Sequence, residues 1–103
     1  MVSYPIYVKR NTYRGRDARK QAKASSENRD ASILEDTVNR LLKQQTQPIK
    51  TYLWSEISRE SGLDFEIVKR LGYSIDCGSN GFTATRPGLS QDEFDRAMRG
   101  EEV

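Results

Sequence analysis

The lysine and arginine residues of this sequence have the type and spacing that could bind anionic groups. Seven of them lie in residues 1–26 against a single carboxylate, Asp17, which gives that stretch a net charge of +6. Residues 27–103 carry ten cations and fourteen carboxylates, a net charge of −4, and the whole chain is +2. A basic segment beside a mildly acidic body is typical of proteins that contact nucleic-acid phosphates. The alternative is a solvated tail.

Four of these cations recur at helical spacing between residues 13 and 25. Nearby alanines favour a helix but offer little apolar surface, so we predict a basic helix or a disordered arm rather than a membrane-surface helix. We expect the arm to supply the phosphate or minor-groove contacts if the partner is DNA. Its candidate DNA-binding residues are Arg10, Arg14, Arg16, Arg19, Lys20 and Lys23.

Catalytic and metal chemistry is excluded in its commonest forms. The sequence has no histidine, and Cys77 is the only cysteine. Ser-His-Asp centres, Cys-His centres, Cys/His zinc sites and internal disulfides therefore cannot form. No phosphate-cradling loop or dinucleotide motif is present either. We expect no enzyme activity, no metal and no small-molecule cofactor.

Length and composition bound the remaining possibilities. At 103 residues the chain has room for one domain, and no apolar run approaches the roughly 20 residues that a membrane span needs. A lone thiol without a signal-like segment leads us to expect a reducing, cytoplasmic location.

The spacing of apolar residues, together with capping residues and prolines, predicts the helices and strands that must position the cations. Residues 2–8 alternate as in a strand, but Pro5 limits them to a sheet edge. Ser32 and Glu35 have capping-box spacing, so we expect a helix to begin near residue 32, or as early as 27, and to end before Pro48. Its core-facing residues would be Leu34, Val38, Leu41 and Leu42.

Two short helices are predicted after a β-prone stretch at residues 49–53. Ser55 is the expected N-cap of the first helix and Gly62 its end, where a left-handed backbone is wanted. Asp64 is the expected N-cap of the second helix, which Gly72 closes. The residues expected to be buried here are Trp54, Ile57, Ile67, Val68 and Leu71.

The pattern of residues 73–85 predicts a β-hairpin turning near Asn80-Gly81. The alternation would place Tyr73, Ile75 and Cys77 on the same face as Phe82 and Ala84. A second capping box, at Ser90 and Glu93, predicts a short C-terminal helix that stops at Gly100.

The order helix, strand, helix, helix, hairpin over residues 30–86 resembles the winged helix-turn-helix family of DNA-binding domains. Gly62 and Leu63 form the turn between the two short helices in this resemblance. It implies an α+β fold with a three-helix core, a β-hairpin wing, a basic N-terminal arm and a short C-terminal helix. The expected divisions are the arm at residues 1–26, the winged domain at 27–86, and the C-terminal helix and tail at 87–103.

The resemblance also implies which residues would touch DNA. The third helix would enter the major groove through its outward residues Phe65, Glu66, Lys69 and Arg70, and the wing would contribute Ser79, Asn80 and Arg86. Two features depart from the family pattern: Asp64 and Glu66 place carboxylates at the helix start, and the wing tip has no cation. Phe65 either contacts a thymine methyl group or covers the core.

We therefore expect a protein that binds double-stranded DNA sequence-specifically, a small transcriptional regulator of prokaryotic, phage or plasmid type, most simply a repressor. A homodimer is expected, through the terminal helix around Phe94 and Met98 or through residues 4–8. One alternative is a winged-helix protein-interaction module, which the acidic start of the third helix favours. The other is RNA or single-strand binding through Tyr4, Tyr7 and Tyr13, although we expect Tyr4 and Tyr7 to pack instead.

Overall fold

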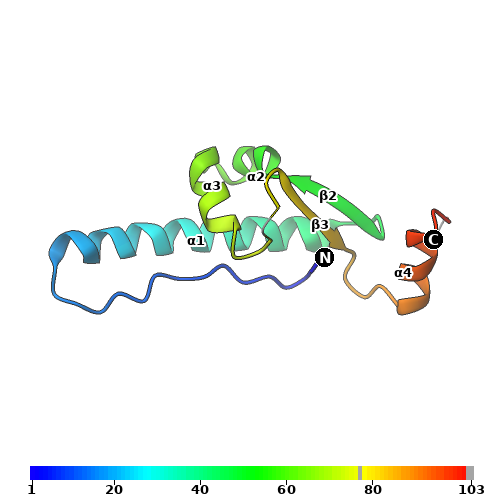
Figure 1. The fold of residues 1–103 in the computed structure, drawn as a ribbon, viewed down its shortest axis with the longest axis horizontal. Coiled ribbons are helices and arrows are strands. Elements are labelled where there is room, and N and C mark those ends of the chain that lie inside the picture. The colour runs from blue at the N-terminus through cyan, green and yellow to red at the C-terminus, as the bar shows by residue number, and fades with distance from the viewer. Residues whose placement is uncertain (77, 102–103) are drawn as a thin grey trace.

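The structure, a computed structural model, describes residues 1–76 and 78–101. It has an α+β fold in which one long helix underlies two short helices and a three-stranded mixed sheet (Figure 1). The chain is elongated, with extents of 55 × 23 × 21 Å. In chain order the elements are β1 (Val2–Ser3), α1 (Ala18–Gln44), β2 (Ile49–Leu53), α2 (Trp54–Ser61), α3 (Phe65–Gly72), β3 (Gly81–Thr85) and α4 (Gln91–Met98).

Helix α1 begins much earlier than the capping-box pattern predicts. Asp17 is the N-cap, and its carboxylate accepts hydrogen bonds from the backbone N–H groups of Arg19 and Lys20 at 2.9 and 3.2 Å. No glycine or proline interrupts the next 27 residues, so the helix continues through Ser32, which lies in its interior. The predicted start near residue 32 was wrong, whereas the predicted end before Pro48 is confirmed.

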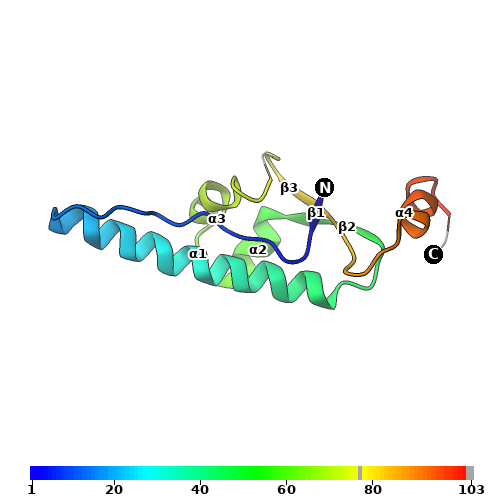
Figure 2. The ribbon, with the colours of Figure 1, turned by 90° about the horizontal axis from the view of Figure 1, so that it is seen from below.

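The N-terminal segment lies antiparallel along α1 (Figure 2). We call residues 4–13 the strap. Asn39 holds it at Ile6: its side chain accepts from the Ile6 N–H at 2.8 Å and donates to the Ile6 carbonyl at 3.1 Å. Asn28 does the same at Asn11, at 2.7 and 3.0 Å. Because Ile6 and Val8 are also buried, the strap is part of the fold.

Strand β3 lies at the centre of the sheet. It pairs antiparallel with β2 and parallel with β1, in the order β1-β3-β2. The predicted edge position of the first strand is confirmed, although only Val2 and Ser3 pair. The predicted hairpin is wrong on its first side, because residues 73–75 form a turn at the end of α3 and residue 76 lies in no strand. Cys77 lies outside the described residues.

The core is built where α1, α2, α3 and the sheet meet. Phe82 packs between two rings: its centroid lies 5.3 Å from Tyr52 and 5.2 Å from Trp54. Trp54 is the predicted core anchor, and its indole N–H donates to the Gly78 carbonyl at 2.9 Å. Burial raises the pKa of the Tyr52 phenol above its usual value of 10.0, and the Glu56 charge adds to this. The largest fully buried side chains among the described residues are Leu34, Val38, Leu42, Trp54, Ile57 and Val68.

The turn between α2 and α3 forms as the sequence predicts. Gly62 adopts a left-handed backbone, with φ of 77°, and its N–H donates to the Ser58 carbonyl at 2.9 Å. Helix α2 begins at Trp54, so Ser55 is not its N-cap. Asp64 occupies the N-cap position of α3 without a side-chain hydrogen bond. Gly72 ends α3 as expected.

The C-terminal helix α4 extends from the end of the sheet (Figure 1). Its predicted cap is confirmed, because the Ser90 hydroxyl accepts from the Glu93 N–H at 3.1 Å. Arg86, at the end of β3, pairs with Glu93. None of the residues of α4 is buried.

Candidate nucleic-acid interface

The exposed face of α3 carries the predicted reading residues. Because Gly62 turns the chain and Val68 faces the core, Phe65, Lys69 and Arg70 remain at the surface. Phe65 is 41% exposed and does not cover the core, and the Lys69 ammonium lies 5.4 Å from its ring centroid. Glu66 is exposed on the same helix. The pair Lys69 and Arg70 is therefore available to an anionic partner.

The basic residues of the predicted arm are distributed over the strap, the loop and the first turns of α1. Lys20 lies 5.8 Å over the Tyr13 ring, and Lys23 pairs with Glu27 at 3.9 Å. These contacts place Lys20 and Lys23 on the face of α1 that the strap covers. The exposed cations of this end of the molecule are Arg14, Arg16, Arg19, Lys20 and Lys23. Figure 1 shows that this end of α1 projects beyond α3.

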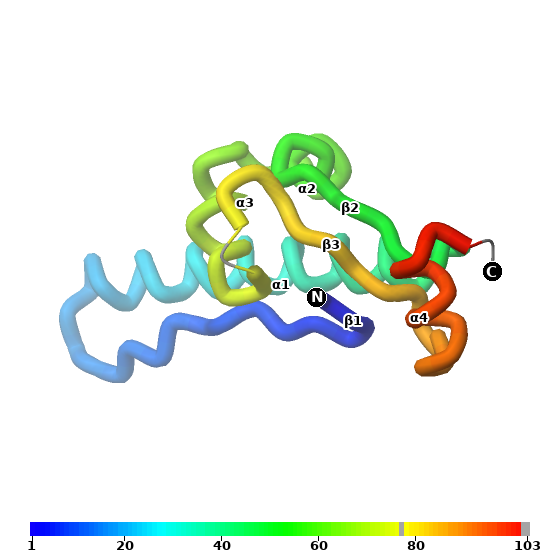
Figure 3. Tube along the Cα trace, turned by 45° about the vertical axis from the view of Figure 1, so that its right-hand side comes forward, coloured from blue at the N-terminus to red at the C-terminus, as the bar shows by residue number. Residues whose placement is uncertain are grey.

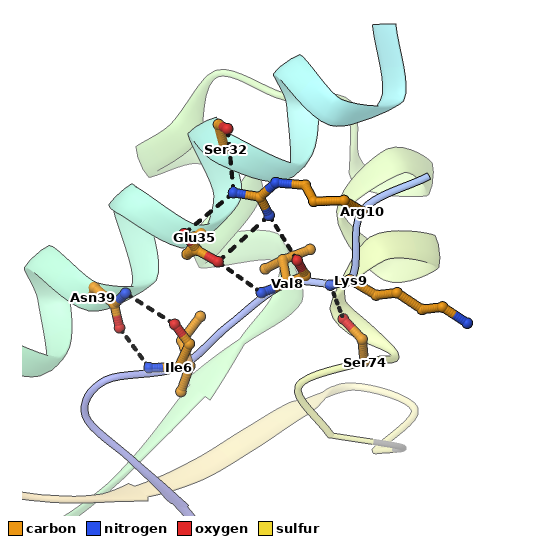
Figure 4. Close-up of polar contacts among 8 residues, drawn as sticks. All are labelled: Ile6, Val8, Lys9, Arg10, Ser32, Glu35, Asn39 and Ser74. Carbon is orange, nitrogen blue, oxygen red and sulfur yellow. Dashed lines mark hydrogen bonds and ion pairs between the residues drawn. The ribbon is translucent and has the colours of Figure 1, made fainter. Parts of the chain in front are cut away.

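Two predicted DNA-binding arginines have structural partners. Arg10 is paired with Glu35 at 3.2 Å, and it donates to the Val8 carbonyl at 2.6 Å and to the Ser32 hydroxyl at 3.2 Å (Figure 4). Arg86 holds α4 through Glu93 and donates to the Thr46 carbonyl at 3.3 Å. Both guanidinium groups are engaged within the chain, so DNA would have to displace those contacts.

Ser79 and Asn80 are exposed in the turn that leads into β3, and the described residues 73–76 form no strand that would make this turn the tip of a hairpin wing. The Asn80 carbonyl accepts from the Trp54 N–H at 2.9 Å, which fixes this turn to the start of α2. The expected DNA contact of Ser79 and Asn80 therefore lacks the β-hairpin that the resemblance to winged domains implies.

An open cleft of about 630 Å³ lies between the strap and the end of α3. The strap contributes Lys9 and Asn11, and α3 and its following turn contribute Arg70, Tyr73 and others. Ser74 joins the two walls, because its hydroxyl accepts from the Lys9 N–H at 3.3 Å and donates to the Leu71 carbonyl at 2.9 Å. Figure 3 shows the end of α3 and the turn that follows it beside the strap. Local sequence patterns carry no signal for this cleft, because wall residues such as Lys9 and Arg70 are 61 positions apart in the chain.

Two exposed aromatic rings belong to the strap and to the turn after α3. Tyr7 is 74% exposed and Tyr73 is 67% exposed. The expectation that Tyr4 and Tyr7 pack was wrong for Tyr7, because the strap turns Ile6 and Val8 toward α1 and directs the residue between them outward.

Residues 1–76 and 78–101 contain no group of three acidic or metal-ligating side chains placed to hold a metal ion. Within the same residues, no helix has the length and apolar character to cross a membrane. Comparison with family models, with curated proteins and with solved structures gave no match to this chain.

Proposed function

We propose that this chain binds double-stranded DNA through a helix-turn-helix unit formed by α2 and α3, with α1 as the helix that supports them. The observation that carries the proposal is the left-handed turn at Gly62, which leaves Lys69 and Arg70 exposed on α3. A short helix with outward cations fits the roughly 12 Å width of the major groove.

The basic end of α1 supplies the electrostatic attraction that α3 alone lacks. Glu66 and Asp64 offset the charge of Lys69 and Arg70, so α3 is close to neutral. Glu27 lies between α3 and the basic end of α1, because it lines the cleft together with Arg70 and also pairs with Lys23. Lys20 lies about 10 Å farther along α1 than Glu27, an offset that suits phosphates flanking the groove.

This binding mode uses no wing. Strands β2 and β3 stand where a winged domain has its sheet, but the hairpin partner of β3 is absent from the described residues 73–76. We therefore assign the DNA contacts to α3 and the start of α1, and we leave Arg10 and Arg86 with their structural partners. Specific binding by such a unit would make the protein a small regulator of transcription.

Fluorescence anisotropy with a random-sequence duplex, at roughly 50 and 200 mM salt, tests the proposal. We expect binding that weakens steeply with salt, and the double variant Lys69→Gln/Arg70→Gln to weaken it about tenfold or more. Lys43→Gln/Lys50→Gln removes the same charge at the opposite end of the molecule and should change binding less than twofold. No binding at the lower salt concentration, or equal effects of the two double variants, would contradict the proposal.

Single-strand binding is the second candidate, and the exposed rings of Tyr7 and Tyr73 favour it. The same titration with a single strand of equal length separates the two. Tighter binding of the single strand, lost in Tyr7→Ala, would replace the duplex proposal.

A further inference from the structure

We propose that the cleft between the strap and the end of α3 is a binding site for a mononucleotide, a small ligand that combines a phosphate with a flat aromatic base. This inference goes beyond DNA binding and does not require it. Its volume of about 630 Å³ lies within the range of small-molecule sites.

The charges on the cleft walls favour a phosphate. Lys9 and Arg70 line the cleft from opposite sides, and within the described part of the chain neither cationic head has an ion-pair partner. Glu27, the carboxylate of the lining, is already engaged: it accepts from the Asn11 amide at 3.0 Å and lies 3.9 Å from the Lys23 ammonium. The uncompensated charge in the cleft is therefore positive.

The side chain that favours an aromatic base is Tyr73. It lines the cleft with a ring that is 67% exposed, directly after the buried Gly72. Leu71 adds apolar surface, and among the described residues no other aromatic side chain lines the cleft. A base stacked on Tyr73 would have its phosphate within the space between Lys9 and Arg70, because all three residues border one cavity.

The walls are held in place before any ligand binds. The Val8 N–H donates to Glu35 at 2.9 Å, which positions the strap just before Lys9. Ser74 then bridges Lys9 to the last turn of α3. Figure 4 shows the strap between these two contacts, with Glu35 of α1 on one side and Ser74 on the other, and with the Lys9 side chain directed away from α1. Since the backbone of both walls is already held, a ligand has to order only the side chains that it contacts.

Isothermal titration of the full chain with adenosine 5′-monophosphate, ribose 5-phosphate and adenosine tests the inference. We expect the monophosphate to bind at least fivefold more tightly than either partial ligand. Tyr73→Ala should weaken the monophosphate at least fivefold and leave ribose 5-phosphate unchanged, whereas Arg70→Gln should weaken both phosphates and leave adenosine unchanged. Lys43→Gln, at an exposed lysine outside the cleft, is the matched control and should leave all three affinities unchanged.

Equal affinities for the monophosphate and ribose 5-phosphate would overturn the inference, because the cleft would then be a phosphate contact only, such as one for a DNA backbone. An unchanged affinity in both cleft variants would overturn it as well. Failure of the monophosphate to bind while the duplex binds removes this inference alone. Monophosphate binding without duplex binding supports it and contradicts the proposed function instead.

Discussion

Gly72 is a position where the absence of one side-chain atom determines the packing of the core. A Cβ added there would lie 2.8 Å from two carbons of the Trp54 ring. That ring is buried between Phe82 and the end of α3, so it has no free direction in which to move. Gly62 is different: a Cβ there would meet nothing within 4 Å, but its backbone is left-handed. The two glycines are required for different reasons, close approach and conformation.

Gly72→Ala should therefore destabilise the protein by about 1–3 kcal/mol and change the Trp54 fluorescence. Gly62→Ala should cost about 1–2 kcal/mol through backbone strain and leave that fluorescence unchanged. Urea denaturation of both variants, monitored by circular dichroism and by Trp54 emission, measures each effect. Wild-type stability for Gly72→Ala would show that the helix end can move away from Trp54.

The strap and α1 are matched in length. Eleven helical residues separate Asn28 from Asn39, and five extended residues separate Asn11 from Ile6; at their usual rises both stretches span roughly 16–17 Å. An extended chain and a helix can therefore share two identical amide contacts without strain. This match explains how a segment with only a two-residue strand is held along the helix.

Asn39→Asp should release the middle of the strap, because a carboxylate still accepts from the Ile6 N–H but cannot donate to the Ile6 carbonyl. We expect amide exchange at Ile6 and Val8 to accelerate about tenfold, with a loss of about 1–2 kcal/mol in stability. Asp36→Asn, the reverse substitution at an exposed position of the same helix, should leave exchange unchanged. Equal protection in both variants would mean that burial of Ile6 alone holds the strap.

Helix α4 depends on a carboxylate at its start. Hydrogen bonding from Ser90 lowers the pKa of Glu93 below its usual 4.5, with Arg86 adding to the effect. A carboxyl group with a lowered folded-state pKa stabilises the attached helix at pH values above 4.5, and this contribution is lost as the pH falls through the lower value.

Acidification below pH 4.5 should therefore weaken the contacts of Glu93 with Ser90 and Arg86, visible by NMR as a change in the Ser90 and Glu93 amide signals. Glu93→Gln should remove this transition, whereas Asp92→Asn, on the same helix turn, should retain it. A transition that persists in Glu93→Gln would assign the pH dependence to another group.

The two ends of α1 carry cations that lie far apart on the molecule. Lys20 and Lys43 lie on the same helix but about 35 Å apart along its axis. The basic end of α1 projects past α3 (Figure 1), whereas Lys43 lies in the last turn of α1, shortly before β2 begins. Deletion of residues 1–23 is unsuitable as a test of the basic arm, because it would also remove β1, the buried strap residues and the N-cap of α1.

Substitution tests the charges without this loss. Arg19→Gln/Lys20→Gln/Lys23→Gln should reduce the salt dependence of duplex binding, each lost phosphate contact lowering the slope by about 0.9. Lys43→Gln should leave the slope unchanged. The slopes come from anisotropy titrations over a series of salt concentrations, and an unchanged slope in the triple variant would remove the basic end from the interface.

The sequence alone determined the features that depend on near neighbours. Gly62, the Ser90 cap and the apolar stripe at Leu34, Val38 and Leu42 were predictable because turn conformation, capping and helical periodicity act within a few residues. The same local rules misplaced the start of α1, since a capping-box pair in a helix interior has the same spacing as one at its end.

Only the tertiary structure decided what pairs across long separations. Phe82 and Ala84 alternate as the sequence predicts, but β3 takes β2 and β1 as partners rather than residues 73–76. Arg10 donates a hydrogen bond to Glu35, 25 residues away, and Lys9 and Arg70 line the same cleft. Such contacts depend on which surfaces fold together, and local propensity carries no information about them.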